Sequence, residues 1–217
     1  MSEILTSLAA ALPLASGWSI HSLWMRRRIA SARRDPLTGL LNRDTFEERA
    51  SKFLNGGPLA VYFVDLDRFK QTNDTYGHAA GDAVIRATGH RIQEWATENG
   101  GLAARLGGDE FVAVTSVYSA GEFDWTLYDL SDRLERPVAF EGTQLAVAAS
   151  IGTIRIDPRT ELADLSALLR RADEEMYKAK QAGVGWSVAP SVAPTLETVN
   201  GRRAGRRGTT GGIGGAA

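Results

Sequence analysis

The sequence contains no cysteine, and this absence excludes several chemistries at once. Disulfide bonds, zinc–thiolate sites and thiol nucleophiles all require cysteine side chains. A strong excess of one charge is also missing, because 25 Lys and Arg residues balance 26 Asp and Glu residues to give a formal net charge of −1. Nucleic-acid-binding domains normally carry a basic excess, so the balance argues against a nucleic-acid partner. A small nucleotide, by contrast, needs only a few local cations.

Neither the length nor the composition indicates wholesale disorder. The chain has 217 residues, of which 43% are hydrophobic and 24% are charged, as in ordinary soluble globular proteins. This length accommodates one domain with a full hydrophobic core and leaves residues over at the ends. Three zones of different composition follow one another along the chain.

The first zone lacks formal charge from residue 4 to residue 25, and Arg26, Arg27 and Arg28 follow at once. A membrane-spanning helix needs about 20 apolar residues, and flanking arginines tend to stay in the cytoplasm. We therefore predict an N-terminal membrane-anchor helix in residues 1–25 and a basic linker in residues 26–34, with the remainder on the cytoplasmic side of the inner (cell) membrane. Pro13 and Gly17 weaken this prediction. The alternatives are an interfacial helix, an uncleaved signal-like segment or a dimerisation helix.

The middle zone, residues 35–186, has the periodicity of a folded domain. The patterns predict strands at residues 59–65, 102–114 (a hairpin across Gly107 and Gly108) and 145–156 (with Gly152 as a bulge), and helices at residues 81–98, 122–136 and 165–179 (ended by Gly183). Strands and helices interleave, which predicts an α/β (α+β) fold of ferredoxin-like type, with helices around a mostly antiparallel central sheet.

The third zone, residues 187–217, is rich in Gly, Ala and Pro and has no apolar periodicity. We predict a disordered, Gly- and Arg-rich tail. A basic patch that meets anionic lipid or nucleic acid is the minority alternative.

Four carboxylates stand at the ends of predicted strands. Asp65 and Asp67 follow an apolar strand, and Asp109 and Glu110 occupy the hairpin tip. If the two segments lie side by side, the carboxylates converge and would repel one another without a hard cation such as Mg²⁺. Each element alone has a simpler interpretation, because Asp-x-Asp is also common in solvated turns and Gly-Gly-Asp is a good hairpin turn.

Groups suited to a nucleotide follow Asp65 along the chain. Lys70 can neutralise phosphate charge, and Asn73 and Asp82 can read the edge of a guanine base. The alternative for Asn73 and Asp82 is helix or turn capping. His78 is interpreted as a structural loop histidine, because its neighbours supply no third orienting group.

These motifs together resemble those of the GGDEF domain family. The resemblance rests on four segments in order and spacing: residues 35–43 (DPLTGLLNR), 64–78 (VDLDRFKQTNDTYGH) with Gly81 and Asp82, 105–111 (RLGGDEF) and 172–180 (ADEEMYKAK). It covers about 150 residues, essentially the whole middle zone.

The resemblance implies the fold of a nucleotide-cyclase palm and a diguanylate cyclase activity, in which two GTP molecules yield cyclic di-GMP and pyrophosphate across a homodimer. It also implies a Mg²⁺ cofactor, with Mn²⁺ as an alternative. By position, it assigns the metal to Asp65, Asp109 and the backbone carbonyl of Leu66, catalysis to Asp109, Glu110 and Lys70, and substrate binding to Asn73 and Asp82 (guanine), Phe69, and Lys180 (triphosphate).

The chain departs from the family pattern in two places. Val184 stands where family members usually carry a phosphate-binding arginine, and Glu98 and Gly101 stand where many carry an Arg-x-x-Asp product-inhibition site. We therefore expect weaker GTP binding and no inhibition through that site. Three alternatives stay open: a degenerate domain that binds GTP or cyclic di-GMP as a regulatory module, an interaction protein that only dimerises, and a cyclase that makes a 3′,5′-cyclic mononucleotide.

Overall fold

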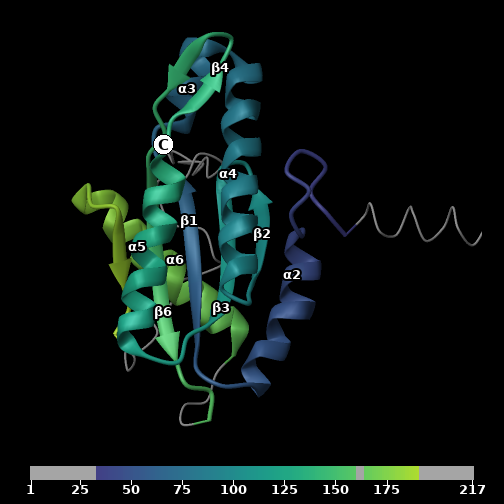
Figure 1. The fold of residues 1–217 in the computed structure, drawn as a ribbon, viewed down its shortest axis with the longest axis vertical. Helices are drawn as coiled ribbons and strands as arrows, with labels where there is room; N and C mark the ends of the chain where they lie inside the picture. The colour runs from purple at the N-terminus through teal and green to yellow at the C-terminus, as the bar shows by residue number, and fades with distance from the viewer. Residues whose placement is uncertain (1–32, 160–163, 191–217) are drawn as a thin grey trace, which may run out of the picture.

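A five-stranded sheet forms the centre of the protein, which a computed structural model describes at residues 33–159 and 164–190 (Figure 1). The strands are β1 (Leu59–Leu66), β2 (Leu102–Gly107), β3 (Glu110–Ser116), β6 (Ala149–Ile156) and β7 (Trp186–Val188). Their order is β2-β3-β1-β6-β7, in which β1 pairs antiparallel with β3 and β6, and β7 pairs parallel with β6. The predicted mostly antiparallel sheet is confirmed.

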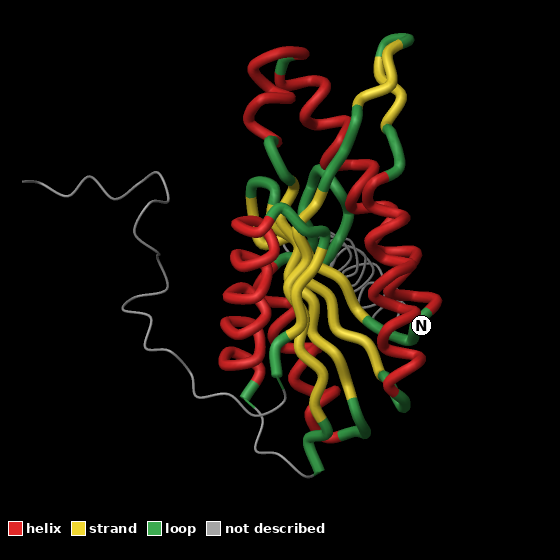
Figure 2. Tube along the Cα trace, turned by 90° about the vertical axis from the view of Figure 1, so that its left-hand side faces the viewer, coloured by secondary structure: helices red, strands yellow, loops and turns green. Residues whose placement is uncertain are grey.

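Helices cover both faces of this sheet (Figure 2). On one face lie α4 (His78–Glu98) and α5 (Ala120–Glu135), and on the other lie α2 (Arg43–Ala50), the 3₁₀ helix η1 (Ser51–Asn55) and α6 (Leu165–Ala182). The short helix α3 (Phe69–Tyr76) connects β1 to α4. The result is a layered α/β fold with two hydrophobic cores, one on each side of the sheet.

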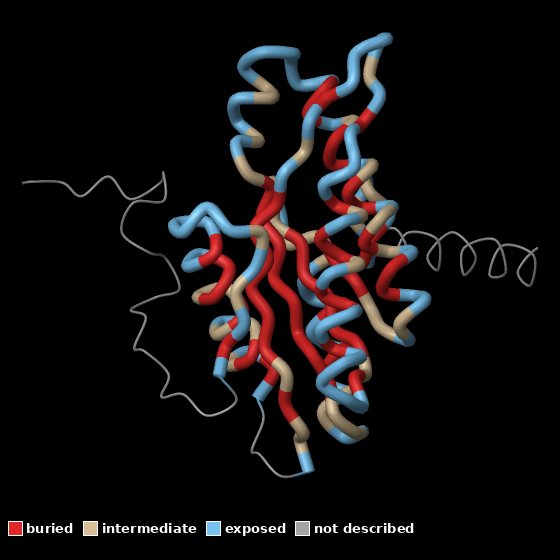
Figure 3. Tube along the Cα trace, turned by 60° about the vertical axis from the view of Figure 1, so that its left-hand side comes forward, coloured by how far each residue is buried: buried red, intermediate tan, exposed pale blue. Residues whose placement is uncertain are grey.

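Strand β1 is central because it is apolar on both faces. All eight of its residues are buried, as Figure 3 shows for the middle of the sheet. Tyr62 points into the core under α4 and α5, where the Trp95 ring meets it edge-on at 4.9 Å. Phe63 points into the opposite core with α2 and α6. A strand buried on both sides reads as a continuous apolar run, which explains why the sequence predicted it.

Helix α6 lies directly on β6 at Gly152. A Cβ at this position would be only 1.9 Å from the Ala172 carbonyl oxygen and 2.0 Å from the Met176 nitrogen. The predicted bulge at Gly152 is wrong, because the register of β6 against β1 runs through it without a shift. The glycine instead permits close approach of a helix backbone. The helix ends at Gly183 in the left-handed region (φ 67°), as predicted.

Several boundaries differ from the prediction. Helix α4 begins at His78, and the predicted strand at residues 145–156 divides into β6 and the end of β5 (Thr143–Leu145), which forms a hairpin with β4 (Val138–Phe140). Strand β7 continues past the predicted domain end at residue 186, and the Ala189 N–H donates to the Thr153 carbonyl. Residues 187–190 therefore belong to the fold.

The predicted membrane anchor in residues 1–25, most of the basic linker and the rest of the tail lie outside the described residues. Among the helices of the described part, none has both the length and the apolar character needed to cross a bilayer.

Candidate active site

The carboxylates from β1 and from the hairpin tip lie next to each other. Asp65 and Glu110 are register partners across β1 and β3, and the Leu66 N–H donates to the Asp109 carbonyl at 3.3 Å. Two glycines make the hairpin tip possible, because Gly107 (φ 146°) and Gly108 (φ 53°) both have positive φ angles. The sequence predicted this adjacency.

Asp65 is buried and contacts a lysine that is distant in the sequence, on the last helix of the domain. Its side chain is 9% exposed, and the Lys180 Nζ on α6 donates to its Oδ1. The same ammonium lies 4.0 Å from Asp67, whose carboxylate accepts a hydrogen bond from the Ser150 hydroxyl at 2.9 Å. A buried carboxylate needs such partners, so Lys180 neutralises the Asp65 charge.

The oxygen donors at this edge of the sheet suit a hard divalent cation that takes only a few of its ligands from the protein. In the described ranges, no group of three or more Asp, Glu, His or Cys side chains is arranged to hold a metal ion. The narrower set of Asp65, Asp109 and the Leu66 carbonyl offers only oxygen donors. Mg²⁺ is commonly held by one or two carboxylates together with substrate phosphates, which this set can accommodate.

The two predicted guanine-reading residues lie on α3 and α4, which pack against each other. A Cβ at Gly81 would lie 1.9 Å from the Asn73 Oδ1 and 3.2 Å from the Phe69 Cζ. Asn73 therefore lies against α4 at Gly81, the residue before Asp82. The Asp82 carboxylate pairs with Arg86 at 3.6 Å. Neither residue caps a helix, because α3 begins after Arg68 and α4 begins after Gly77, so the alternative of helix capping is wrong.

Lys70 and His78 lie on the exposed surface. The Lys70 ammonium faces Asp74 at 3.6 Å, and both side chains are about two-thirds exposed. The structure does not bring Lys70 to the Asp65 carboxylate. His78 is the exposed first residue of α4, so its predicted place in a loop is wrong.

A pocket of about 490 Å³ opens beside Lys180. It is lined by Asp67, Arg68, Glu135, Ala148, Ala149, Lys180, Gly183, Val184 and Gly185. Val184, which stands at the position of the missing arginine, is 49% exposed there. Sequence reasoning missed Arg68, although its position directly after Asp67 was a usable signal.

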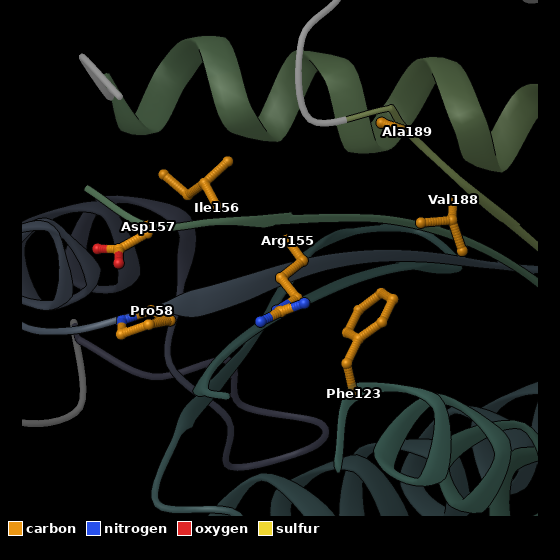
Figure 4. Close-up of a pocket in the computed structure, with 7 residues that line it drawn as sticks. All are labelled: Pro58, Phe123, Arg155, Ile156, Asp157, Val188 and Ala189. Carbon is orange, nitrogen blue, oxygen red and sulfur yellow. The ribbon is translucent and has the colours of Figure 1, made fainter. Parts of the chain in front are cut away.

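A second pocket, of about 360 Å³, lies at the opposite end of β1 and β6 (Figure 4). Arg155 lies in it between Pro58 and Phe123, and Ile156, Asp157, Val188 and Ala189 complete the lining. It contains none of the predicted site residues.

The positions of the family's product-inhibition motif are occupied differently. Glu98 pairs with Arg133 on α5 at 2.6 Å, and this hydrogen bond lowers the pKa of Glu98 below its ordinary value. A Cβ at Gly101 would lie 2.2 Å from the Val114 carbonyl oxygen. An aspartate cannot occupy this position without a backbone shift.

An ion pair ties the hairpin to the start of the domain. Arg105 contacts the Asp35 carboxylate at 3.1 Å and donates to the Gly108 carbonyl at 2.7 and 3.0 Å. Desolvation raises the pKa of Asp35, but hydrogen bonds from Thr38 and Arg105 outweigh it, and the net result is a lowered pKa. The pair therefore supports the tip that carries Asp109.

Comparisons with known proteins find relatives by sequence and by fold. The chain is 45% identical over 173 residues to an uncharacterized 19.3 kDa protein of Streptomyces ambofaciens, a match that covers 79% of this chain and 91% of that protein. It is 39% identical over 162 residues to diguanylate cyclase TpbB of Pseudomonas aeruginosa, but this match spans only 36% of that longer relative. The solved coiled coil and GGDEF domain of DgcB from Caulobacter crescentus, in complex with c-di-GMP, has a TM-score of 0.72 at 27% identity, covering 84% of this chain and all of that one.

The family comparison covers the described domain up to the residue before β7. Residues 32–185 match the family described as "Diguanylate cyclase, GGDEF domain". This range includes all the predicted site residues, from Asp65 on β1 to Lys180 on α6. The chain therefore belongs to the GGDEF domain family.

Proposed function

We propose that this domain condenses two GTP molecules into cyclic di-GMP and pyrophosphate. The observation that carries the proposal is the adjacency of Asp65 and Asp109 across β1 and β3, with Lys180 at the same edge. The Asn73–Asp82 pair on the α3–α4 corner supplies a separate group of base-reading atoms. A metal-binding set and a guanine-reading set on one domain are what a GTP-dependent nucleotidyl transfer requires.

In each half-reaction, the 3′-hydroxyl of one GTP attacks the α-phosphorus of the other. A new P–O bond forms, the bond to the β-phosphate oxygen breaks, and pyrophosphate leaves. Asp65, Asp109 and the Leu66 carbonyl would hold Mg²⁺ (or Mn²⁺), which when bound acidifies the hydroxyl and offsets charge on the leaving group. The Asp109 carboxylate, with Glu110, is the group proposed to receive the hydroxyl proton.

The remaining site residues bind and orient the substrate. Asn73 and Asp82 face the guanine edge, with the carboxylate accepting hydrogen bonds from the base. Phe69 packs beneath the same corner, where its ring lies close to Gly81. Lys180 and Lys70 provide positive charge for the phosphates, which requires Lys180 to leave the Asp65 carboxylate and Lys70 to leave Asp74.

The proposed reaction requires two copies of the chain. One domain offers one GTP site, whereas the product contains two bonds formed between two nucleotides. Two domains facing each other across a twofold axis satisfy this requirement, and the product has the same symmetry. Relatives named above as a diguanylate cyclase and as a complex with c-di-GMP support the proposal by similarity.

A degenerate domain that binds nucleotide without turnover is the second candidate. It is favoured by a single observation, the apolar Val184 in the pocket beside Lys180. Loss of one charge-assisted contact weakens binding by about 1.5–3 kcal/mol but leaves the metal-binding carboxylates in place. We therefore propose an active enzyme with reduced GTP affinity.

The deciding experiment incubates the full chain with GTP and Mg²⁺ and identifies the products by mass. The expected products are cyclic di-GMP and pyrophosphate, lost in Asp65→Asn and Asp109→Asn and retained in Asp124→Asn, an exposed control on α5. GTP binding without any product would support the degenerate domain. A 3′,5′-cyclic mononucleotide product would refute the dinucleotide chemistry.

The cellular location is a separate proposal. The membrane anchor in residues 1–25 and the cytoplasmic, inner-membrane position of the domain stay predictions from the sequence. Fractionation of cells that produce the full chain, compared with a chain lacking residues 1–25, tests them. Equal recovery of both chains in the soluble fraction would contradict the anchor.

A further inference from the structure

The pocket beside Lys180 contains four charged residues, and three of them already have an identifiable role or partner. Lys180 contacts Asp65, Asp67 accepts a hydrogen bond from Ser150, and Glu135 lies within 3.4 Å of the Ser131 hydroxyl. Within the described ranges, no hydrogen bond or ion pair engages the guanidinium of the fourth, Arg68. Its charge is therefore free to meet a ligand.

Two other arginines of the domain have acceptors for their guanidinium groups. Arg105 binds Asp35 and the Gly108 carbonyl, and Arg133 binds Glu98 and Asp129. Arg68, by contrast, is exposed on the rim of a concave site. An arginine fork that lines a pocket and has no acceptor among the residues that the structure describes is well suited to bidentate binding of phosphate oxygens.

The backbone also fixes Arg68 at this place. Its φ of 54° and ψ of 22° lie in the left-handed region, which is uncommon for a residue with a side chain. This conformation turns the chain from β1 into α3 and makes Arg68 the N-cap of α3, with no side chain capping the helix. The Gln71 N–H donates to the Arg68 carbonyl at 2.8 Å, which leaves the N–H groups of Phe69 and Lys70 without a backbone acceptor among the described residues, at the same end as the guanidinium.

We propose that Arg68 binds the terminal phosphates of the nucleoside triphosphate and supplies the cation that Val184 does not. This inference rests on the proposed function, because it takes GTP as the substrate. Val184 and Arg68 line the same pocket, together with Lys180. Arg68, in the turn between β1 and α3, thus takes the place of the arginine that family members carry at position 184, in the loop after α6.

The test compares two ligands and four variants of the full chain. The ligands, in Mg²⁺ buffer, are 3′-deoxy-GTP, which lacks the attacking hydroxyl and is not turned over, and guanosine, which lacks phosphates. The variants are Arg68→Gln, Val184→Arg, their combination, and Arg159→Gln. Glutamine keeps the Cβ and much of the length of arginine, so the left-handed backbone is equally strained. Arg159 is an exposed control, paired with Asp157 beyond the far end of β6.

Arg68→Gln should weaken binding of 3′-deoxy-GTP about 10- to 100-fold, the loss of one charge-assisted contact, and leave guanosine binding unchanged. Val184→Arg should tighten 3′-deoxy-GTP binding more in the Arg68→Gln background than in the native chain. Arg159→Gln should bind both ligands as the native chain does.

Several outcomes would overturn the inference. Native-like binding of 3′-deoxy-GTP by Arg68→Gln, or an equal loss for guanosine, refutes a phosphate contact. Equal tightening by Val184→Arg in both backgrounds refutes the exchange of roles between the two positions. Binding that is absent even in the native chain would overturn the GTP-dependent proposed function as well, so the two failures are distinguishable.

Discussion

The contact between Lys180 and Asp65 predicts competition between an ammonium group and a metal ion. Asp65 is the buried carboxylate that we propose for Mg²⁺, and in the structure Lys180 forms an ion pair with it. A Mg²⁺ ion at Asp65 must displace this ammonium. Replacing Lys180 by Met, which has similar length and no charge, should therefore strengthen metal binding while weakening the binding of a triphosphate.

The structure sets the size of the effect. Removing one partner of a buried ion pair costs about 3–5 kcal/mol, but Lys180 is 38% exposed, which reduces the cost to about 1–3 kcal/mol. Without metal, Lys180→Met should lose this much free energy of unfolding. Mg²⁺ at about ten times its dissociation constant should restore about 1.4 kcal/mol. The native protein should gain much less from the same concentration.

The assay is urea unfolding of native and variant chains with and without Mg²⁺. The matched control is Lys178→Met on the same helix, where Lys178 pairs at 2.6 Å with the buried Glu175. This control should also lose stability, but Mg²⁺ should not restore it. If Lys180→Met is as stable as the native chain without metal, or if Mg²⁺ stabilises both chains equally, the reasoning is refuted.

Three further predictions follow from single positions. Gly152→Ala should destabilise the protein by about 3 kcal/mol or more, because the new methyl group meets the backbone of α6; an unfolding midpoint within error of the native value would contradict this. The pKa of Asp35 is lowered in the folded state, so its ionised form should stabilise the fold above about pH 4, and this contribution should be lost as the pH falls further. Asp35→Asn should therefore reduce the loss of unfolding free energy below about pH 4. An unchanged dependence of stability on pH in this range would refute the prediction. Cyclic di-GMP should not inhibit turnover through the Glu98 position. Adding an Arg-x-x-Asp pattern with Glu98→Arg and Gly101→Asp should create inhibition only at a cost in stability, because the new Cβ at residue 101 meets the Val114 carbonyl. Tight binding of cyclic di-GMP by this double variant in calorimetry, together with an unchanged unfolding midpoint, would contradict this.

Elements with a strong local pattern were predictable from the sequence. Residues 59–64 of β1 form an uninterrupted apolar run, and α6 has a regular apolar face and a glycine at its end. Helix α3 was missed because its sequence, FKQTNDTY, contains no buried residue and several poor helix formers. It is kept in place by its packing on α4, which a local pattern does not reveal.

Contacts between segments that are distant in the sequence were the other feature that local patterns did not reveal. Lys180 meets Asp65 across 115 positions of sequence, and only the tertiary fold brings them together. Gly152 was taken for a bulge because a glycine inside a strand has two common causes, and the second, close approach of another backbone, depends on where α6 lies. The alternative of Asp82 as a helix cap is excluded because α4 begins earlier, at His78, and this start was not predicted from the sequence.

The central position of β1 divides the site into two parts with different dynamics. The strand that ends in Asp65 is hydrogen-bonded on both edges and buried on both faces, so its amide protons should exchange with solvent only on global unfolding. The α3 helix has no buried residue and lies outside the sheet, so its amides should exchange through local opening. The proposed metal-binding end thus lies on a strand held at both edges, whereas the proposed base-reading corner lies on a helix that can open locally.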